Sequence, residues 1–159
     1  MNYQYDPMGS RRRTNIFQHA GFQYGFIGGV VMWGIRLVLL LLFGGTNQGD
    51  ILALIFQIFV YIFIGKAAAQ KHYVSQRNEV NATRGVKGAG TGAALVTSVL
   101  SWLFIIVRSV VRDAFGYVVL VEPVGLFCLM VVDVLIAMGI GSWAGKSVEK
   151  KYQIHIMQF

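Results

Sequence analysis

The sequence predicts an all-α fold, a four-helix transmembrane bundle built from two tandem hairpins. The 159 residues are 55% hydrophobic, their mean hydropathy is +0.58, and only 13% are charged. A soluble domain usually has about a quarter of its residues charged. The apolar residues also gather into four segments close to the roughly 20 residues that a helix needs to cross a ~30 Å hydrocarbon core. We therefore predict an integral membrane protein with four spans.

The predicted spans are separated by polar or turn-forming stretches. The turn "GGTNQGD" joins the first two spans, and "QKHYVSQRNEVNATRG" joins the second to the third. In the last connection, residues 114–121 are apolar but too short to cross, so they either lie at the interface or lengthen the fourth helix. The predicted transmembrane domain covers 22–145, with spans at 22–43, 51–69, 88–107 and 124–144 and polar tails at 1–21 and 146–159.

Lysine and arginine are distributed unevenly about the spans, which predicts the orientation. The tails and the central connection carry most of them, whereas the opposite side has Arg112 and, at its boundary, Arg108. The positive-inside rule places both termini on the cytoplasmic or matrix side. We expect a multi-pass protein of the bacterial cytoplasmic membrane, with an organelle inner membrane as the alternative. Basic residues expected to contact lipid head groups are Arg11, Arg12, Arg13, Lys66 and Lys146.

Small residues recur at four-residue spacing and predict close helix packing. Such residues share one helix face and let two backbones approach each other in lipid. Packing inside the bundle is the preferred interpretation, and a docking face for another subunit is the alternative. The stripes in the first and third spans both lead to a tryptophan, Trp33 or Trp102, which suggests that the hairpins arose by duplication. The stripe residues are Gly21, Gly25 and Gly29 in the first span, Gly90, Ala94 and Ser98 in the third, and Gly141 and Gly145 in the fourth.

Two charged residues and one amide lie inside the predicted spans. Arg36 is about eight residues, or ~12 Å, from the non-cytoplasmic end of its span, and Asp133 is about ten residues, or ~15 Å, from the same side. Gln57 occupies the corresponding place in the second span. A lone charge at the bilayer centre costs at least ~2.5–3.5 kcal/mol, so a partner is expected. We predict an Arg36–Asp133 pair with Gln57 nearby; transport chemistry, or an external partner for one charge, are the alternatives.

Catalytic and cofactor-binding residues are not evident. His19 and His72 lie at helix ends rather than in mid-span, which leaves them as minor candidates for axial ligands of a haem or pigment. No Cys/His cluster has the spacing of a metal site. We therefore predict that the protein is not an enzyme and has no cofactor of its own. Bound lipid, or contacts to pigments or quinone held by neighbouring subunits, are the expected ligands.

Two segments resemble known membrane proteins. The stretches "IGKAAAQKHYVSQR" and "GVKGAGTGAALVTSVLSW", within 64–102, resemble small four-helix bacterial membrane proteins of unclear function. In those proteins a span ends in a Gly/Ala–basic stretch and the next begins with a Gly/Ala stripe. The resemblance covers about two-thirds of the chain and implies a fold more than an activity. "GFQYGFIGGVVMWGIR" (21–36) is also similar to the first span of the mitochondrial inner-membrane translocase family, although the second span here has fewer glycines; this likeness implies protein translocation.

These features predict a non-catalytic accessory subunit of a larger integral-membrane assembly. By analogy, the expected host is an electron-transport complex of respiration or photosynthesis, in which the chain stabilises neighbouring subunits and lipid. The C-terminal "YQIHIMQF" alternates apolar and polar residues, as a docking strand or surface segment would. The alternative function is a small transporter or proton- or ion-conducting component that uses Asp133, Arg36 and Gln57. The expected partners are lipids and membrane subunits and not nucleic acid, because the basic residues flank the spans.

Overall fold

The structure is a computed structural model that describes residues 19–44, 47–76, 85–114 and 123–156. These residues form four α-helices and no strand: α1 (Ala20–Phe43), α2 (Asn47–Ser75), α3 (Val86–Ala114) and α4 (Pro123–Ile156). All four helices are long and apolar enough to cross a membrane, and each contains one predicted span. The predicted all-α bundle of four membrane-spanning helices is therefore confirmed.

Residues with suitable backbone chemistry mark the helix ends. His19 is the N-cap of α1, and its Nδ1 accepts a hydrogen bond from the backbone N–H of Gly21 at 3.2 Å. Gly44 ends α1 in the left-handed conformation, with φ of 59°, and donates its N–H to the Leu40 oxygen at 2.9 Å. Pro123 begins α4, where a residue without an N–H group is well tolerated. Local sequence thus determines where these helices start and stop.

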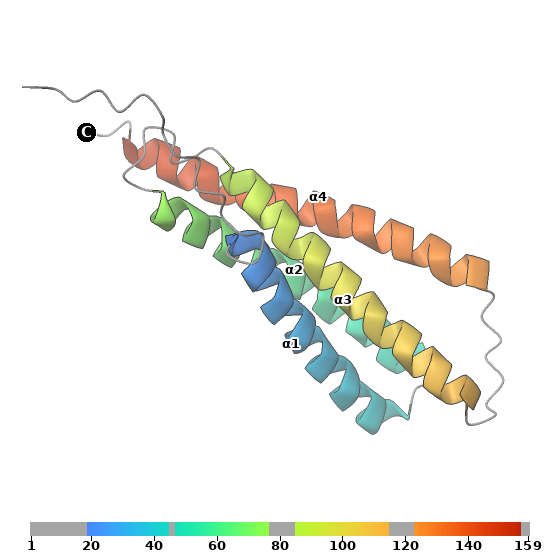
Figure 1. Ribbon diagram of the computed structural model, residues 1–159. Helices are drawn as coiled ribbons and strands as arrows, with labels where there is room; N and C mark the ends of the chain where they lie inside the picture. Colours follow the sequence, from blue (N-terminus) through green and yellow to red (C-terminus); the bar gives the residue numbers. More distant parts are fainter. Residues whose placement is uncertain (1–18, 45–46, 77–84, 115–122, 157–159) are drawn as a thin grey trace, which may run out of the picture.

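The two middle helices of the chain are also the middle of the bundle. α2 and α3 each contact all three other helices, whereas α1 and α4 do not contact each other within the described residues. Successive helices run in opposite directions, and Figure 1 shows them spreading apart where α4 begins. We call the end where α1 and α3 begin the terminal end, and the end where α2 and α4 begin the far end.

Small side chains fill the interior and large apolar ones face outward. Ala68, Ala93 and Ala137 have no exposed surface, whereas the side chains of Leu41 and Leu42 are 84% and 71% exposed. This pattern is the reverse of a soluble core, in which large apolar residues are buried. It is typical of helices that pack through small residues and present apolar side chains to lipid. The outer surface of the bundle is therefore suited to contact with membrane lipid.

Two helices continue beyond their predicted spans at the terminal end. α2 extends past residue 69 to Ser75, and α4 extends past residue 144 to Ile156. The reason is mutual packing: the rings of Tyr73 and Tyr152 stack with centroids 3.9 Å apart, and Val148 is buried nearby. Most of the predicted C-terminal tail is therefore helical. The expectation of a docking strand in "YQIHIMQF" is wrong for residues 152–156, which belong to α4.

Several expectations fall on parts of the chain that lie outside the described residues. These are the predicted N-terminal tail up to residue 18, with its three arginines, and the last three residues of the chain. The apolar stretch at 115–121 and the acidic residue that follows it also lie outside. The choice between an interfacial segment and a longer fourth helix therefore stays open for that stretch, although α4 as described begins at Pro123.

Candidate functional site

Asp133, in α4, is the acceptor at the centre of a polar cluster. Its Oδ2 atom accepts hydrogen bonds from Ser98 Oγ at 2.7 Å and Trp102 Nε1 at 2.9 Å, both in α3. The same oxygen accepts from Gln57 Nε2 at 2.8 Å and Tyr61 Oη at 2.9 Å, both in α2. Gln57 Nε2 also donates to Tyr61 Oη. Donors from two helices thus converge on one atom of a third, which fixes α2, α3 and α4 relative to one another.

Arg36, in α1, joins this cluster from the other side of Gln57. Its Nη2 donates to Gln57 Oε1 at 2.7 Å, and its Nε donates to Ser101 Oγ at 3.1 Å. Ser101 Oγ in turn donates to Gln57 Oε1 at 3.3 Å. The amide of Gln57 therefore accepts from the cation through its oxygen and donates to the anion through its nitrogen. We call the cluster the polar hub; its members are Arg36, Gln57, Tyr61, Ser98, Ser101, Trp102 and Asp133.

The hub differs from the predicted pair in one respect. The structure brings Arg36, Gln57 and Asp133 together, but Arg36 and Asp133 form no direct ion pair. The physical reason is the position of Gln57, whose side chain lies between them and satisfies both with one amide group. The two charges still belong to one hydrogen-bonded network with no net charge, which is the condition under which charges are tolerated inside a membrane.

The uncharged members of the hub are buried, whereas Arg36 and Asp133 are half-buried. Tyr61, Ser98 and Ser101 have no exposed surface, and Gln57 is 1% exposed. Within the described residues, every buried side-chain nitrogen or oxygen atom has a hydrogen-bond partner. Because an unpaired polar group in an apolar medium costs more than a hydrogen bond gains, this network stabilises one helix arrangement over the others.

Sequence reasoning missed part of the hub. Tyr61 was not singled out, although it lies one helical turn from Gln57 and therefore on the same face. Ser101 was also missed, and Trp102 was noted only as the end of a small-residue stripe. A signal was present in "SVLSW", because Ser98, Ser101 and Trp102 follow the three- and four-residue spacing of one helix face. Ser98 was predicted as a packing residue, and in the structure it is a donor to Asp133.

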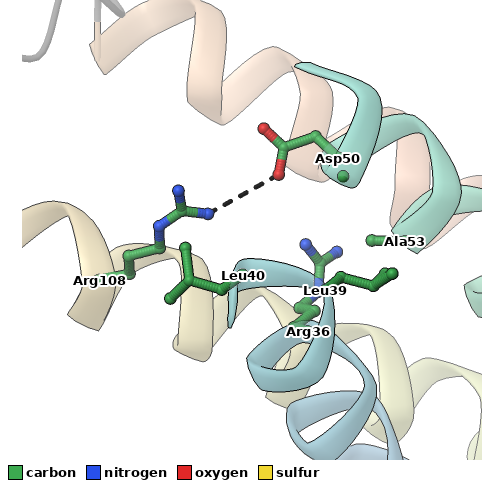
Figure 2. Close-up of a pocket in the computed structure, with 7 residues that line it drawn as sticks. Arg36, Leu39, Leu40, Asp50, Ala53 and Arg108 are labelled. Carbon is green, nitrogen blue, oxygen red and sulfur yellow. Dashed lines mark ion pairs between the residues drawn. The ribbon is translucent and has the colours of Figure 1, made fainter. Parts of the chain in front are cut away.

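Polar side chains continue from the hub toward the far end of the bundle. Arg36 lines a shallow pocket there with Asp50 and Arg108 (Figure 2). Arg108 Nη1 lies 3.7 Å from Asp50 Oδ1, an ion pair near the surface. The volume of the pocket is about 10 Å³, roughly the space that one water molecule requires. The hub is therefore linked to the far end through Arg36.

Toward the terminal end the centre of the bundle is closed by helix backbones. Gly65, Gly90 and Gly141 meet there: a Cβ atom placed on Gly90 would lie 2.7 Å from the oxygen of Gly141 and 3.1 Å from that of Gly65. Ala94 and Ala137, which lie between this contact and the hub, are fully buried. Polar side chains thus connect the hub to one end of the bundle, and close backbone packing separates it from the other.

All the predicted small-residue stripes lie in contacts inside the bundle. A Cβ atom on Gly21 would lie 2.9 Å from the oxygen of Ala89, and those on Gly25 and Gly29 would meet Val96 and Leu100, all in α3. Gly90 and Ala94 of α3 instead contact α4, where a Cβ atom on Gly141 would lie 2.8 Å from that of Ala94. Gly145 of α4 also packs against α3, because a Cβ atom placed on it would lie 2.8 Å from the Cα of Lys87. These stripes are therefore not available as outward docking faces.

The remaining predicted residues lie at the terminal end. The rings of His19 and His72 have centroids 5.5 Å apart, and His19 Nδ1 is used as the helix cap described above. The described part of the chain contains no group of three or more side chains of the kind that bind metal. The Nζ of Lys66 lies 5.7 Å from the centre of the Trp143 ring, and Lys146 is exposed. The expectation that both lysines contact lipid head groups stays a prediction.

Comparison with known proteins gives this chain no relative. No protein-family model, curated protein or solved structure matches it. The two resemblances drawn from the sequence stay predictions, and function has to be argued from the polar hub and the surfaces around it.

Proposed function

We propose that this chain is a non-catalytic subunit of a larger integral-membrane assembly. The observation that carries this proposal is the hub: Asp133 accepts from four side chains of α2 and α3, and Arg36 ties α1 to the same network. Hydrogen bonds within the hub engage most of its polar groups, and groups engaged in this way specify how helices pair rather than bind a substrate. Such a bundle is suited to a fixed structural role beside other subunits and lipid.

Two further observations support a structural role. The small-residue stripes are occupied by contacts inside the bundle, and the outer surface is made of large apolar side chains. Among the described residues, polar side chains link the hub to the far end alone, so these residues form no continuous polar route from one end of the bundle to the other. By analogy we propose a respiratory or photosynthetic complex as the host, with lipid, pigment or quinone held by neighbouring subunits.

One observation favours transport as a second candidate. The sequence of contacts Asp133–Gln57–Arg36 leads to the pocket beside Asp50, and membrane-embedded carboxyl groups commonly mark proton pathways. Such a path would reach only half-way across one chain. Proton or ion transport would therefore require a second copy or another subunit to supply the other half.

The two candidates are separated by purification and by a flux measurement. Under the subunit proposal, extraction of the native protein in mild detergent and mass spectrometry return this chain with other membrane proteins at fixed ratios. Proteoliposomes containing the purified chain alone then show no more proton or ion flux than empty liposomes. A homo-oligomer that conducts, and that stops conducting when Asp133→Asn is introduced, would overturn the subunit proposal in favour of transport.

A further inference from the structure

Two positive groups and one negative group line the pocket at the far end, because the carboxylate of Asp133 that balances Arg36 lies in the hub and outside this lining. The pocket is lined by the guanidinium groups of Arg36 and Arg108 and by the single carboxylate of Asp50. α2 begins at Asn47, so the backbone N–H groups of its first turn, including that of Gly49, add partial positive charge at this end. The pocket is therefore suited to an anion.

The two guanidinium groups retain hydrogen-bonding capacity toward the pocket. Arg36 uses its Nε and Nη2 atoms within the hub, and its Nη1 has no partner among the described residues. The ion pair between Arg108 and Asp50 spans 3.7 Å, which is too long for a hydrogen bond, and Arg108 forms no hydrogen bond within the described part of the chain. Figure 2 shows the Arg108 side chain reaching over Leu40 toward Asp50. An anion in the pocket could thus accept hydrogen bonds from both arginines.

We propose that this pocket binds a phosphate oxyanion. Guanidinium groups match the geometry of phosphate oxygens and form charge-assisted hydrogen bonds with them. The volume of about 10 Å³ admits one oxygen atom and not a whole phosphate group, so the rest of the group lies at the mouth beside Arg108. That chemistry belongs to the head group of an anionic phospholipid or to free inorganic phosphate.

The surroundings of the pocket are compatible with a lipid. Leu39 and Leu40 line it, and the strongly exposed Leu41 and Leu42 follow on α1. Acyl chains can lie along such a surface while the phosphate remains at the level of Arg108. The side chain of Asp50 is 58% exposed, so it can turn away from Arg108 when the anion binds. This site does not depend on the proposed role as a subunit.

The test measures binding of phosphatidylglycerol to the full chain in detergent by native mass spectrometry, and binding of inorganic phosphate in a parallel series. Replacing Arg108→Gln removes one charge-assisted contact and should weaken binding about tenfold. Replacing Asp50→Asn removes the competing carboxylate and should strengthen binding. The matched control, Lys151→Gln, removes an exposed positive charge at the terminal end and should leave binding unchanged. Thermal unfolding of each variant confirms that it is folded, and Arg108→Lys, which keeps the charge, replaces Arg108→Gln if the latter is not.

The opposite effects at Arg108 and Asp50 are what distinguish a binding site from a simple ion pair. If the two residues merely stabilise each other, both substitutions lower stability, and their effects on binding are not opposite. Equal effects of Arg108→Gln and Lys151→Gln, or weaker binding in Asp50→Asn, would overturn the proposal. If inorganic phosphate shows the same variant pattern, free phosphate is the source of the oxyanion; if phosphatidylglycerol alone shows it, the source is the lipid.

Discussion

Gln57 allows two opposite charges to share one network without touching. Its amide is both acceptor and donor, so the Arg36 guanidinium and the Asp133 carboxylate are each satisfied at distances of 2.7 Å and 2.8 Å. A direct ion pair would have left the Gln57 amide without one or both of these charged partners. The bridged arrangement satisfies all of these groups, which is why losing any one of them affects the others.

Replacing Asp133→Asn should reduce the free energy of unfolding by about 2–3 kcal/mol. The substitution removes the charge that balances Arg36 and weakens the hydrogen bonds that converge on Oδ2. Asp50→Asn is the control, because its carboxylate lies near the surface, and its effect should stay below about 1 kcal/mol. Unfolding by denaturant in detergent measures both; equal effects of the two substitutions would contradict a stabilising hub.

The bridge also predicts coupling between Arg36 and Asp133 despite the absence of direct contact. Arg36→Met and Asp133→Leu should each be destabilising because each leaves an unbalanced charge in the membrane. The double variant removes both charges, so its loss of stability should be smaller than the sum of the single losses by about 1–2 kcal/mol. A double-mutant cycle measures this difference. Additive losses would show that the two charges act independently.

At the scale of elements, α3 connects the two parts of the bundle through two different faces. Its face around Ala89, Ala93 and Val96 meets the glycines of α1, whereas Gly90 and Ala94 meet α4. Neighbouring residues in a helix point about 100° apart, so one short segment can supply both contacts. The small stripe of α3 is thus one of two packing surfaces, and it belongs to the contact with α4.

The glycines of α4 provide a matched pair for testing this packing. Gly141→Ala should be destabilising by about 1–3 kcal/mol, because its Cβ would lie 2.6 Å from the oxygen of Gly90 and force α3 and α4 apart. Gly139→Ala, in the same helix, has no neighbour within 4 Å and should be neutral or slightly stabilising. Thermal unfolding of the two variants in detergent makes the comparison. Similar melting temperatures would mean that a Cβ atom at position 141 does not weaken the packing of α3 against α4.

The predicted duplication relates positions of α2 to positions of α4. Gln57 and Asp133 were predicted as equivalent positions, and they hydrogen-bond to each other at 2.8 Å. A Cβ atom on Gly65 would lie 3.5 Å from the Cα of Gly141. Trp33 and Trp102 differ, because Trp33 Nε1 donates to the Leu100 oxygen at 2.7 Å, whereas Trp102 donates to Asp133. The duplication stays a prediction, and any symmetry is incomplete in α1 and α3.

At the scale of the whole molecule, both described ends of the chain lie at one end of the bundle (Figure 1). The positively charged residues near that end predict that it faces the cytoplasm or matrix. The far end then lies at the opposite membrane surface, and the proposed oxyanion site lies in the outer leaflet. The orientation therefore decides which lipid or phosphate pool can reach Arg108.

Cysteine labelling tests this orientation. In a chain with Cys128→Ser, a new cysteine is introduced by Gln48→Cys at the far end or by Lys151→Cys at the terminal end, where both side chains are exposed. A membrane-impermeant maleimide added to intact cells should label the Gln48→Cys protein alone, and permeabilised cells should allow labelling of both. Labelling of the Lys151→Cys protein in intact cells would reverse the assignment.

The four spans were predictable because each one is a continuous run of apolar residues in the sequence. Each predicted span lies within one helix, whereas the extensions to Ser75 and Ile156 depend on contacts such as that between Tyr73 and Tyr152. The site was predictable in part: counting residues placed Arg36, Gln57 and Asp133 at similar depths. The four-residue spacing places Tyr61 on the same face of α2 as Gln57, but it does not show which helix that face contacts.

Hydropathy and residue counting along the chain were enough to predict four membrane-spanning helices and similar depths for Arg36, Gln57 and Asp133. Depth follows from position, since each residue of a helix advances the chain by about 1.5 Å. The direction in which each side chain faces was decided by the tertiary structure alone. A rotation of α2 by one residue, about 100°, would remove Gln57 from between Arg36 and Asp133 while leaving every depth almost unchanged. The close contact of Gly65 with Gly90 and Gly141 restricts the rotation of α2, and this rotation positions Gln57 in the bridged hub.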